Sequence, residues 1–543
     1  MARMTGGEAL AKSLAREGVR VVFGLPGVQL YGAVAALRDE PGLRVVTTRH
    51  EQATTYMADG YARAGGGVAA ALVVPGPGLL NAAAGLSTAY AASSPVLLIV
   101  GQVPKAYLGK KVGVLHEVDD QLEAIRGVTK WRRTVLEAAE VPRAVHDAVT
   151  QLRTGRPRPV AIEIPPDALE AEAEVELLPP GDAVRPAADP AEVERAARLL
   201  LAAARPVIYA GGGIHASGAH EALARVAAHL QAGVIQTGEG KGAVSDASDL
   251  SLGAGLWREN PLHAYLQAAD VVLAVGTRLA LVGLGPAQQV VQLDVDPEEI
   301  GRNHAKTLGL VGDARATLET LLARLQSEPP RPSRKTEREA LRARLAAVAS
   351  EMEPPAAILR SLRAGLPEDA IVVPDMTQVG YHCRPFWPVY RPRTYLTSSY
   401  SGNLGFAFPV ALGAKVACPQ RPVVSLSGDG GFLFNAQELA TAVQYGINVV
   451  AVVFNDQAYG NVARDLDEAW GGQFASELDN PDFVRLAEAF GVAAWRAKDP
   501  ADLEALVRRA VGMDRPALIE MAVDRMPRPP FFSPRKQPAR YQR

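Results

Sequence analysis

Two distant stretches of the sequence share one order of elements, and this repeat limits the folds that the chain can adopt. In the first, the apolar run AAALVV at 69–74 leads to the turn PGPG, a small-residue helical segment and the apolar run PVLLIVG. In the second, PVVSLS at 422–427 leads to GDGG, another helical segment and INVVAVVFND. Short continuous apolar runs that alternate with helical segments are typical of parallel sheets covered on both faces. We therefore expect an α/β fold of doubly wound parallel sheets.

Two stretches rich in proline and acidic residues interrupt this alternation, at 168–192 and at 327–337. They predict three domains, at 1–170, 190–326 and 350–543, and a chain of 543 residues is too long for a single core. The repeated unit falls in the first and third domains. We expect their two sheets to face one ligand with the carboxyl ends of their strands.

The composition argues against several classes of protein. The formal net charge is only -2 and 48% of the residues are hydrophobic, as in an ordinary globular protein, so we expect no nucleic-acid partner. The longest apolar runs have the length of strands, and no signal-peptide core is evident. The two cysteines, Cys383 and Cys418, are too few for a disulfide framework. These features predict a cytoplasmic protein that does not bind a membrane.

The second glycine turn carries a carboxylate, Asp429, between glycines. A glycine turn before a helix lets a phosphate approach backbone N–H groups, but Asp429 would repel that phosphate unless a cation lay between them. The next apolar run ends in Asn455 and Asp456. If the two strands are parallel neighbours, these oxygen ligands meet Asp429 and form a site for Mg²⁺. Either feature alone is more often a turn or a helix cap, whereas the pair predicts a metal-bridged diphosphate.

The stretch GDGGFLFNAQELATAVQYGINVVAVVFNDQAYG resembles the cofactor motif of thiamine diphosphate enzymes. Over essentially the whole chain the sequence is most similar to the acetolactate synthase and benzoylformate decarboxylase group. This resemblance implies a pyrimidine-binding domain, a central domain and a diphosphate-binding domain. It also implies Mg²⁺ bound by the side chains of Asp429 and Asp456 and the carbonyl of Ala458, with Asn455 as the alternative to Asp456. The other cofactor contacts that it implies are Gly428, Gly430, Gly431, Thr377, Gln378 and Tyr459.

Two further motifs carry roles implied by the resemblance. The stretch SSYSGNLGFAFPVALGA matches the segment that bends the cofactor, with Leu404 as the apolar wedge and Gly402 as the carbonyl that receives the 4′-amino group. Read alone, Leu404 is an ordinary core leucine. The stretch RHEQATTYMADGYARAGG matches the family's glutamate motif, and it implies that Glu51 protonates the pyrimidine N1′ in general acid–base catalysis. A glutamate in the first turn of a helix is otherwise a partner of the helix dipole.

The resemblance places the substrate pocket at GLPGVQL, VVPGPG and GKKVGVLHEVDDQ, with Val28, Gln29, Val74 and His116 as lining residues. His116 is a second catalytic candidate because an imidazole titrates in the useful range; a surface histidine is the alternative. Benzoylformate decarboxylase has a histidine near the place of Val74, so an aryl decarboxylase is not favoured.

The implied activity is carbon–carbon bond cleavage and formation on a 2-oxo acid, first of all acetolactate synthase-like carboligation after decarboxylation. A simple 2-oxo acid decarboxylase or a lyase acting on 2-hydroxyacyl or dione substrates is the alternative, and a noncatalytic cofactor-binding protein is the alternative of another class. The resemblance implies a homodimer or homotetramer with active sites at the subunit interface. In the central domain, VIYAGGGIHASGA is a weak dinucleotide signal, so FAD is possible but not favoured.

Overall fold

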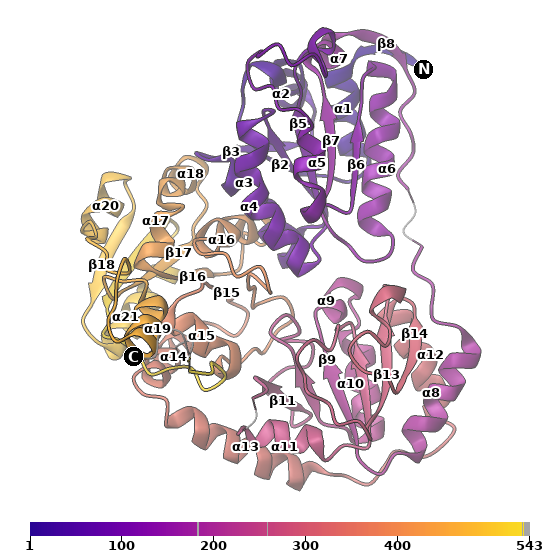
Figure 1. Cartoon of the computed structure of the whole chain (residues 1–543), viewed down its shortest axis with the longest axis vertical. Coiled ribbons are helices and arrows are strands. Elements are labelled where there is room, and N and C mark those ends of the chain that lie inside the picture. The colour runs from indigo at the N-terminus through magenta and orange to yellow at the C-terminus, as the bar shows by residue number, and fades with distance from the viewer. Residues whose placement is uncertain (182–183, 258, 535, 537–543) are drawn as a thin grey trace.

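The computed structural model describes residues 1–181, 184–257, 259–534 and 536. The expected third domain runs to residue 543, so its residues 535 and 537–543 lie outside the described part. Three large sheets form three lobes (Figure 1), and all strand pairs within these sheets are parallel. The sheets have six, six and five strands. The predicted α/β class with three doubly wound parallel sheets is confirmed.

The N-terminal sheet has the strand order β3-β2-β4-β5-β7-β6. Its strands are β2 (Val21–Gly24), β3 (Arg44–Thr47), β4 (Ala69–Val73), β5 (Val96–Gly101), β6 (Trp131–Thr134) and β7 (Val160–Ile164). The helices of this lobe are α1 (Gly6–Arg16), α2 (Tyr31–Asp39), α3 (Glu51–Tyr61), α4 (Pro77–Ala92), α5 (Gln121–Ala124), α6 (Val141–Arg153) and α7 (Pro166–Glu170). A separate antiparallel pair joins β1 (Ala2–Thr5) to β8 (Glu172–Val175).

Alternation along each strand sends successive side chains to opposite faces of this sheet. On β2, Val22 joins a core with residues of α1, α2, α6 and α7, whereas Phe23 joins a core with residues of α3 and α4. The sheet therefore lies between two helical layers, and the layer of α3 and α4 packs against the C-terminal lobe.

The central sheet has the order β11-β10-β9-β12-β13-β14. Its strands are β9 (Pro206–Ala210), β10 (Val234–Gln236), β11 (Ser251–Ala254), β12 (Val271–Val275), β13 (Gln289–Asp294) and β14 (Thr307–Val311). The helices are α8 (Pro190–Ala202), α9 (Gly213–Ser217), α10 (His220–Leu230), α11 (Pro261–Gln267) and α12 (Ala314–Leu325). Helix α13 (Lys335–Ser350) follows, and its buried Arg338 binds Asp249 and Gln231 of this lobe.

The C-terminal sheet has the order β15-β16-β17-β19-β18. Its strands are β15 (Ile371–Pro374), β16 (Val423–Gly428), β17 (Val450–Asn455), β18 (Ala493–Ala497) and β19 (Ala517–Ala522). The helices are α14 (Pro355–Ala364), α15 (Gln378–Phe386), α16 (Ala407–Ala417), α17 (Asp429–Leu433), α18 (Leu439–Tyr445), α19 (Gly460–Trp470), α20 (Phe483–Ala489) and α21 (Pro500–Val511). The predicted parallel pairing of β16 with β17 is confirmed.

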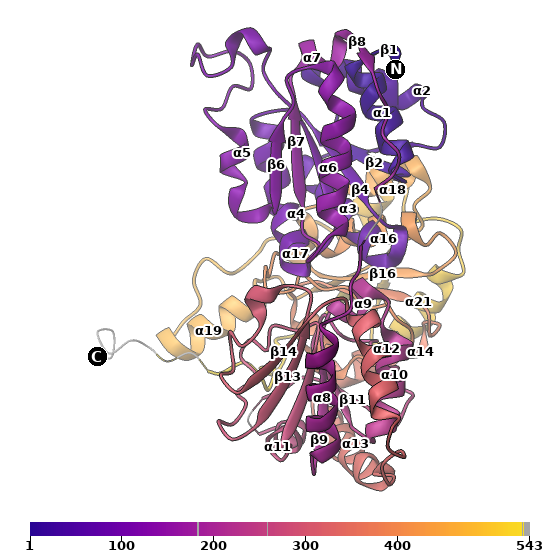
Figure 2. The same ribbon diagram turned by 90° about the vertical axis from the view of Figure 1, so that its right-hand side faces the viewer.

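The N-terminal and C-terminal lobes share one apolar core, in which α3 lies against α16 (Figures 1 and 2). Two glycines make this crossing close. A Cβ atom on Gly60 would lie 2.0 Å from the Val410 carbonyl oxygen, and one on Gly413 would lie 1.9 Å from that of Met57. Because Glu51 begins α3 and the segment with Leu404 leads into α16, this crossing fixes the relative positions of two predicted functional segments.

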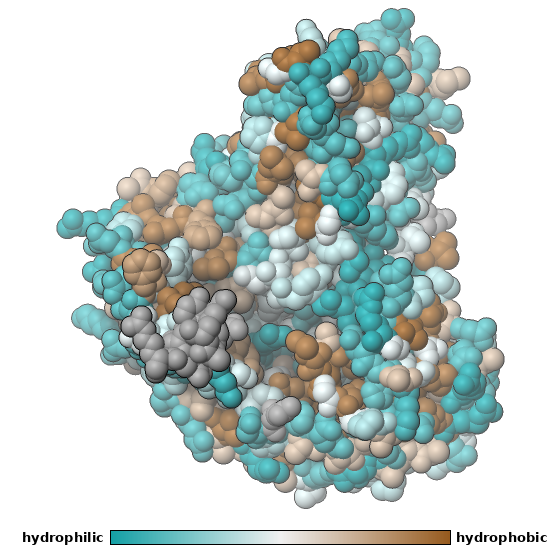
Figure 3. All heavy atoms as spheres, viewed as in Figure 1, coloured by the Kyte–Doolittle hydropathy of each residue, from teal (hydrophilic) through white to brown (hydrophobic). Residues whose placement is uncertain are grey.

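The hollow between the central and C-terminal lobes carries hydrophobic side chains (Figure 3). Trp257 of the central lobe contacts Phe386 of α15 and Phe531 of the C-terminal segment, so aromatic rings also join these two lobes. Within the described ranges, no helix combines the length and the apolar character needed to cross a membrane.

Candidate functional site

The carboxyl ends of β16 and β17 bring Asp429 and Asp456 together, as the sequence predicts for two parallel neighbours. Asp429 is buried, and its carboxyl group lies within hydrogen-bonding reach of that of Asp456. Burial, followed by the charge of Asp429, raises the pKa of Asp456 to about 7. Burial also raises the pKa of Asp429. Two carboxyl groups held together away from water favour a divalent cation between them, so these residues fit Mg²⁺.

The side chains of Asn455 and Asp456 point to different partners. Asp456 Oδ2 accepts a hydrogen bond of 2.6 Å from Gln378 Nε2, and its carboxyl group lies beside that of Asp429. Asn455 Nδ2 donates to Glu520 Oε1 at 2.9 Å, and its Oδ1 lies 3.2 Å from the Asn480 Nδ2 that also binds Asp429. Of the two alternatives that the sequence leaves open, Asp456 is therefore in direct contact with Asp429, whereas Asn455 is connected to it through Asn480.

The glycine turn is packed against the other predicted cofactor residues. A Cβ atom on Gly428 would lie 3.0 Å from Thr377 Oγ1, and one on Gly430 would lie 2.7 Å from the Tyr459 ring. A Cβ atom on Gly431 would lie 3.4 Å from the backbone nitrogen of Gly405. The turn thus brings its backbone close to Thr377, Tyr459 and the segment that carries Leu404.

Leu404 lies in a loop that is anchored on both sides of Gly405. The Gly405 N–H donates to Asp375 Oδ1 at 3.1 Å, and the Gly405 carbonyl accepts from Asn435 Nδ2 at 2.7 Å. Burial raises the pKa of Asp375 to about 7, although three backbone N–H groups oppose this shift. Gly402 has φ +66°, a left-handed conformation that favours glycine. The Leu404 side chain is 37% exposed, so it is not an ordinary core leucine.

Glu51 opens helix α3, whose first turn is capped by the His50 side chain. Asn81 Nδ2 of α4 donates a hydrogen bond of 3.0 Å to Glu51 Oε2. The next residue, Gln52, donates to the Phe434 carbonyl, at the end of α17. Glu438 accepts from the N–H groups of Arg49 and His50, which fixes the chain just before Glu51.

The four predicted pocket residues gather at the carboxyl edge of the N-terminal sheet. Gly27, before Val28, faces Val74 so closely that a Cβ atom would lie 2.3 Å from Val74 Cγ1. Gln29 Nε2 donates to the Leu115 carbonyl at 3.3 Å, which holds the loop that carries His116. A Cβ atom on Gly76 would lie 2.5 Å from the His116 carbonyl oxygen.

Two polar atoms of this pocket have no hydrogen-bond partner among the described residues: Gln29 Oε1 and His116 Nδ1, both buried. His116 also has φ +69°, which is unfavourable for a residue with a side chain. Unpaired buried polar atoms and backbone strain both occur preferentially at functional sites.

The predicted residues therefore fall into three groups, around Asp429, around Glu51 and around His116. Within the described part of one chain, no hydrogen bond joins Glu51 or His116 directly to the Asp429 group. Sequence reasoning missed four residues that hold these groups: Asn81, Asp375, Glu438 and Asn480, whose Nδ2 donates to Asp429 Oδ2. In the sequence, the stretch DNPDF around Asn480 is typical only of a turn. No local motif marks the other three residues, because their roles depend on contacts in the folded chain.

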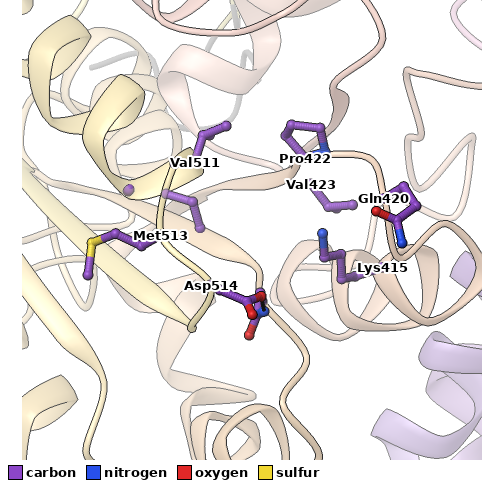
Figure 4. A pocket seen from close by; sticks show the side chains of 11 residues that line it. Lys415, Gln420, Pro422, Val423, Val511, Met513 and Asp514 are labelled. Carbon is purple, nitrogen blue, oxygen red and sulfur yellow. Dashed lines mark hydrogen bonds between the residues drawn. The ribbon is translucent and has the colours of Figure 1, made fainter.

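A pocket of about 240 Å³ opens at the other end of the C-terminal sheet, lined by Lys415, Val423, Met513 and Asp514 among others (Figure 4). Val423 begins β16, whereas Asp429 follows its end. This pocket thus lies at the amino edge of the sheet, away from the predicted site.

Comparison with known proteins matches each of the three lobes to a domain of one enzyme family. Residues 4–124 match the family pattern "Thiamine pyrophosphate enzyme, N-terminal TPP binding domain", residues 193–321 match the central domain, and residues 375–521 match the C-terminal TPP binding domain. The chain is 34% identical to the probable acetolactate synthase large subunit of Methanocaldococcus jannaschii, covering 96% of this chain and 92% of the relative. It is 37% identical to the probable 2-ketoarginine decarboxylase AruI of Pseudomonas aeruginosa, covering 95% and 94%. It is 32% identical to the acetolactate synthase isozyme 3 large subunit of Escherichia coli, covering 96% of each chain. With all three of its parallel-sheet lobes matched in order, the chain belongs to the thiamine pyrophosphate enzyme family.

Proposed function

We propose that the protein uses thiamine diphosphate and Mg²⁺ to decarboxylate a 2-oxo acid and to transfer the remaining acyl fragment to a second carbonyl compound. The observation that carries this proposal is the contact between the Asp429 and Asp456 carboxyl groups beside a glycine turn. Its acetolactate synthase-like form is supported by the similarity to acetolactate synthase large subunits over 96% of the chain.

The metal would be held by Asp429, Asp456 and the Ala458 carbonyl. The diphosphate would lie against the glycine turn at 428–431, near Thr377, Gln378 and Tyr459. Leu404 would support the bent cofactor, and the Gly402 carbonyl would accept from its 4′-amino group. When bound, thiamine diphosphate supplies an electron sink that permits cleavage of the bond between a carbonyl carbon and its carboxylate.

The remaining residues would act on protons and on the substrate. Glu51 would hold and transfer the proton at the pyrimidine N1′, and Asn81 would fix its carboxylate. Val28, Gln29 and Val74 would form the wall of the substrate pocket. His116 would orient the substrate or protonate the product, and its unpartnered Nδ1 supports this role.

A decarboxylase without acyl transfer is the second candidate. The unpartnered Gln29 Oε1 and His116 Nδ1 favour a substrate whose own side chain carries hydrogen-bonding groups. A relative of 37% identity is named a probable 2-ketoarginine decarboxylase, and that substrate ends in N–H donors. A polar 2-oxo acid could satisfy both atoms, whereas pyruvate is too short to offer such donors.

We propose a homodimer or a homotetramer with active sites between subunits. Four large apolar side chains that are exposed near the predicted site support this arrangement: Leu80, Leu404, Leu433 and Phe434.

We also propose that the chain divides into domains at 1–170, 190–326 and 350–543, which is consistent with three sheets within 21–164, 206–311 and 371–522. FAD remains disfavoured, since the N–H groups of Gly211 and Gly213 already donate to Val275 and Gly276.

Product analysis by NMR tests the reaction. Purified protein with thiamine diphosphate and Mg²⁺ receives pyruvate in one sample and 2-ketoarginine in another, with Glu51→Gln as the control. Acetolactate from pyruvate, absent in Glu51→Gln, is the expected result. Decarboxylation of 2-ketoarginine without acyl transfer would establish the second candidate instead. Absence of turnover with either acid and with a panel of longer 2-oxo acids, despite cofactor binding, would contradict both.

A further inference from the structure

The segment 476–480, here called the clasp, pairs with the chain that follows β17. The Tyr459 N–H donates to the Ser476 carbonyl, and the Leu478 N–H donates to the Gln457 carbonyl, both at 2.8 Å. Between these two bonds Ala458 faces Glu477 in an antiparallel bridge. The clasp therefore fixes the backbone on both sides of Ala458.

This pairing leaves the Ala458 carbonyl oxygen available to bind a metal ion. The bonds on either side make Ala458 and Glu477 a non-hydrogen-bonded pair, and the N–H and C=O groups of such a residue point away from the partner strand. In the described part of the chain, no backbone or side-chain donor is bonded to the Ala458 carbonyl. A carbonyl that is held in place and unpaired is a suitable metal ligand.

The last residue of the clasp contacts the carboxylate side of the same site. Asn480 Nδ2 donates to Asp429 Oδ2 at 2.6 Å and lies 3.2 Å from Asn455 Oδ1. Gln378 Nε2 makes the corresponding bond to Asp456 Oδ2. Each of the two carboxylates thus has one oxygen that accepts a hydrogen bond from a side-chain amide, which helps to fix its orientation.

The clasp also packs against the glycine turn. A Cβ atom on Gly430 would lie 2.8 Å from Leu478 Cδ1. The exposed residues of the clasp, Glu477 and Asp479, lie on its outer side. The clasp therefore touches the site through its backbone, through Leu478 and through the Asn480 amide.

We propose that Asn480 is a positioning residue for the metal site, and that the clasp presets the Ala458 carbonyl and the Asp429 carboxylate before the cation binds. Amide donors that orient ligating carboxylates typically change metal affinity 10- to 100-fold when removed. This inference rests on the proposed function, because it takes Asp429, Asp456 and Ala458 as the ligands of Mg²⁺. It adds a ligand-orienting segment that none of the sequence motifs indicated.

The test compares Asn480→Ala with Asn448→Ala. Asn448 is a matched control, since its Nδ2 also donates to a carboxylate, Asp514, but at the amino edge of the same sheet. Mg²⁺ binding is titrated calorimetrically in the presence of saturating thiamine diphosphate. We expect about 10- to 100-fold weaker Mg²⁺ binding in Asn480→Ala and unchanged binding in Asn448→Ala.

A second readout follows the coordination sphere. Mn²⁺ replaces Mg²⁺, and its electron paramagnetic resonance spectrum reports the symmetry of the ligands. The spectrum should change in Asn480→Ala and match the wild type in Asn448→Ala. If Asn480→Ala does not fold, the nearly isosteric Asn480→Leu takes its place, because it retains side-chain volume while removing the donor.

The outcomes separate the two proposals. Mg²⁺ affinity within about twofold of wild type in the folded Asn480 variants, with an unchanged Mn²⁺ spectrum, would overturn the role of Asn480 alone. A wild-type protein that binds neither Mg²⁺ nor Mn²⁺ in the presence of thiamine diphosphate would overturn the proposed function itself.

Discussion

Asn81 Nδ2 lies 3.0 Å from Glu51 Oε2 and donates a hydrogen bond to it, which links the first turn of α3 to α4. Residues of both helices join the core shared with the C-terminal lobe, and this bond holds the predicted catalytic carboxylate of α3 against α4.

Replacing Asn81 should weaken catalysis more than cofactor binding. Because hydrogen bonds to charged groups contribute about 1.5–3 kcal/mol, Asn81→Ala should lower kcat roughly 10- to 100-fold. The affinity for thiamine diphosphate should change little. In a Glu51→Gln background the same substitution should have almost no further effect, since the two residues act as a unit. Equal and independent losses in the two backgrounds would show that Asn81 acts elsewhere.

Gly460 begins α19 directly beside the predicted metal ligands. A Cβ atom there would lie 2.1 Å from Asp456 Oδ2 and 2.8 Å from Gln378 Nε2, so Gly460→Ala must displace the carboxylate. We expect at least about a tenfold loss of Mg²⁺ affinity, measured by titration with thiamine diphosphate present. Gly472→Ala is the control because its Cβ would meet no atom within 4 Å. Unchanged affinity in Gly460→Ala would exclude Asp456 as a ligand.

The buried carboxyl group of Glu438 should make the free energy of unfolding depend on pH. Burial raises the pKa of its carboxyl group to about 7 from the ordinary 4.5, against the hydrogen bonds from Thr441, Arg49 and His50. The folded state thus retains this proton at pH values where the unfolded chain has lost it. The contribution of Glu438 is most favourable below pH 4.5, falls as the pH rises to about 7, and is constant above that.

Denaturant unfolding of wild type and Glu438→Gln measures this contribution. Because glutamine does not titrate, the stability of Glu438→Gln relative to wild type should increase between pH 4.5 and about 7. The change should be on the order of 3 kcal/mol. A difference that is independent of pH across this range would show that the Glu438 pKa is not raised.

Arg63 joins all three lobes and should be important for stability. Its guanidinium binds the fully buried Asp59, donates to the Thr397 carbonyl at 2.8 Å and lies 3.6 Å from Glu239 of the central lobe. Removing one partner of a buried ion pair typically costs about 3–5 kcal/mol, so Arg63→Ala should lower the free energy of unfolding by that amount. The exposed pair Arg38 and Asp39 is the control, and Arg38→Ala should cost less than about 1 kcal/mol. Similar losses of stability in Arg63→Ala and Arg38→Ala would contradict the importance of the buried Arg63 ion pair.

The three large sheets could be predicted from the sequence because their strands are short, continuous apolar runs between glycine turns. It also indicated that Asp429 and Asp456 would meet, since parallel neighbours place their carboxyl ends at one edge. The strand at Ala2–Thr5 was not predicted from the sequence, because its partner strand Glu172–Val175 lies far along the chain. Such pairing depends on the folded chain and not on local sequence.

The supporting residues were unpredictable for the same reason. Asn480 reaches Asp429 only because the clasp folds back on the chain after β17. Glu438 reaches the backbone before Glu51 only when two lobes pack together. A single asparagine or glutamate has no local pattern that marks it as such a partner.

In the proposed mechanism, Glu51 activates a thiamine diphosphate held by the Asp429 site. The most direct measurement is the rate at which bound thiamine diphosphate exchanges its C2 proton for deuterium, followed by acid quench and NMR in wild type and Glu51→Gln. We predict fast exchange in wild type and a rate about 10²- to 10⁴-fold lower in Glu51→Gln, with both proteins saturated with cofactor and Mg²⁺. Equal exchange rates in the two proteins would contradict the account.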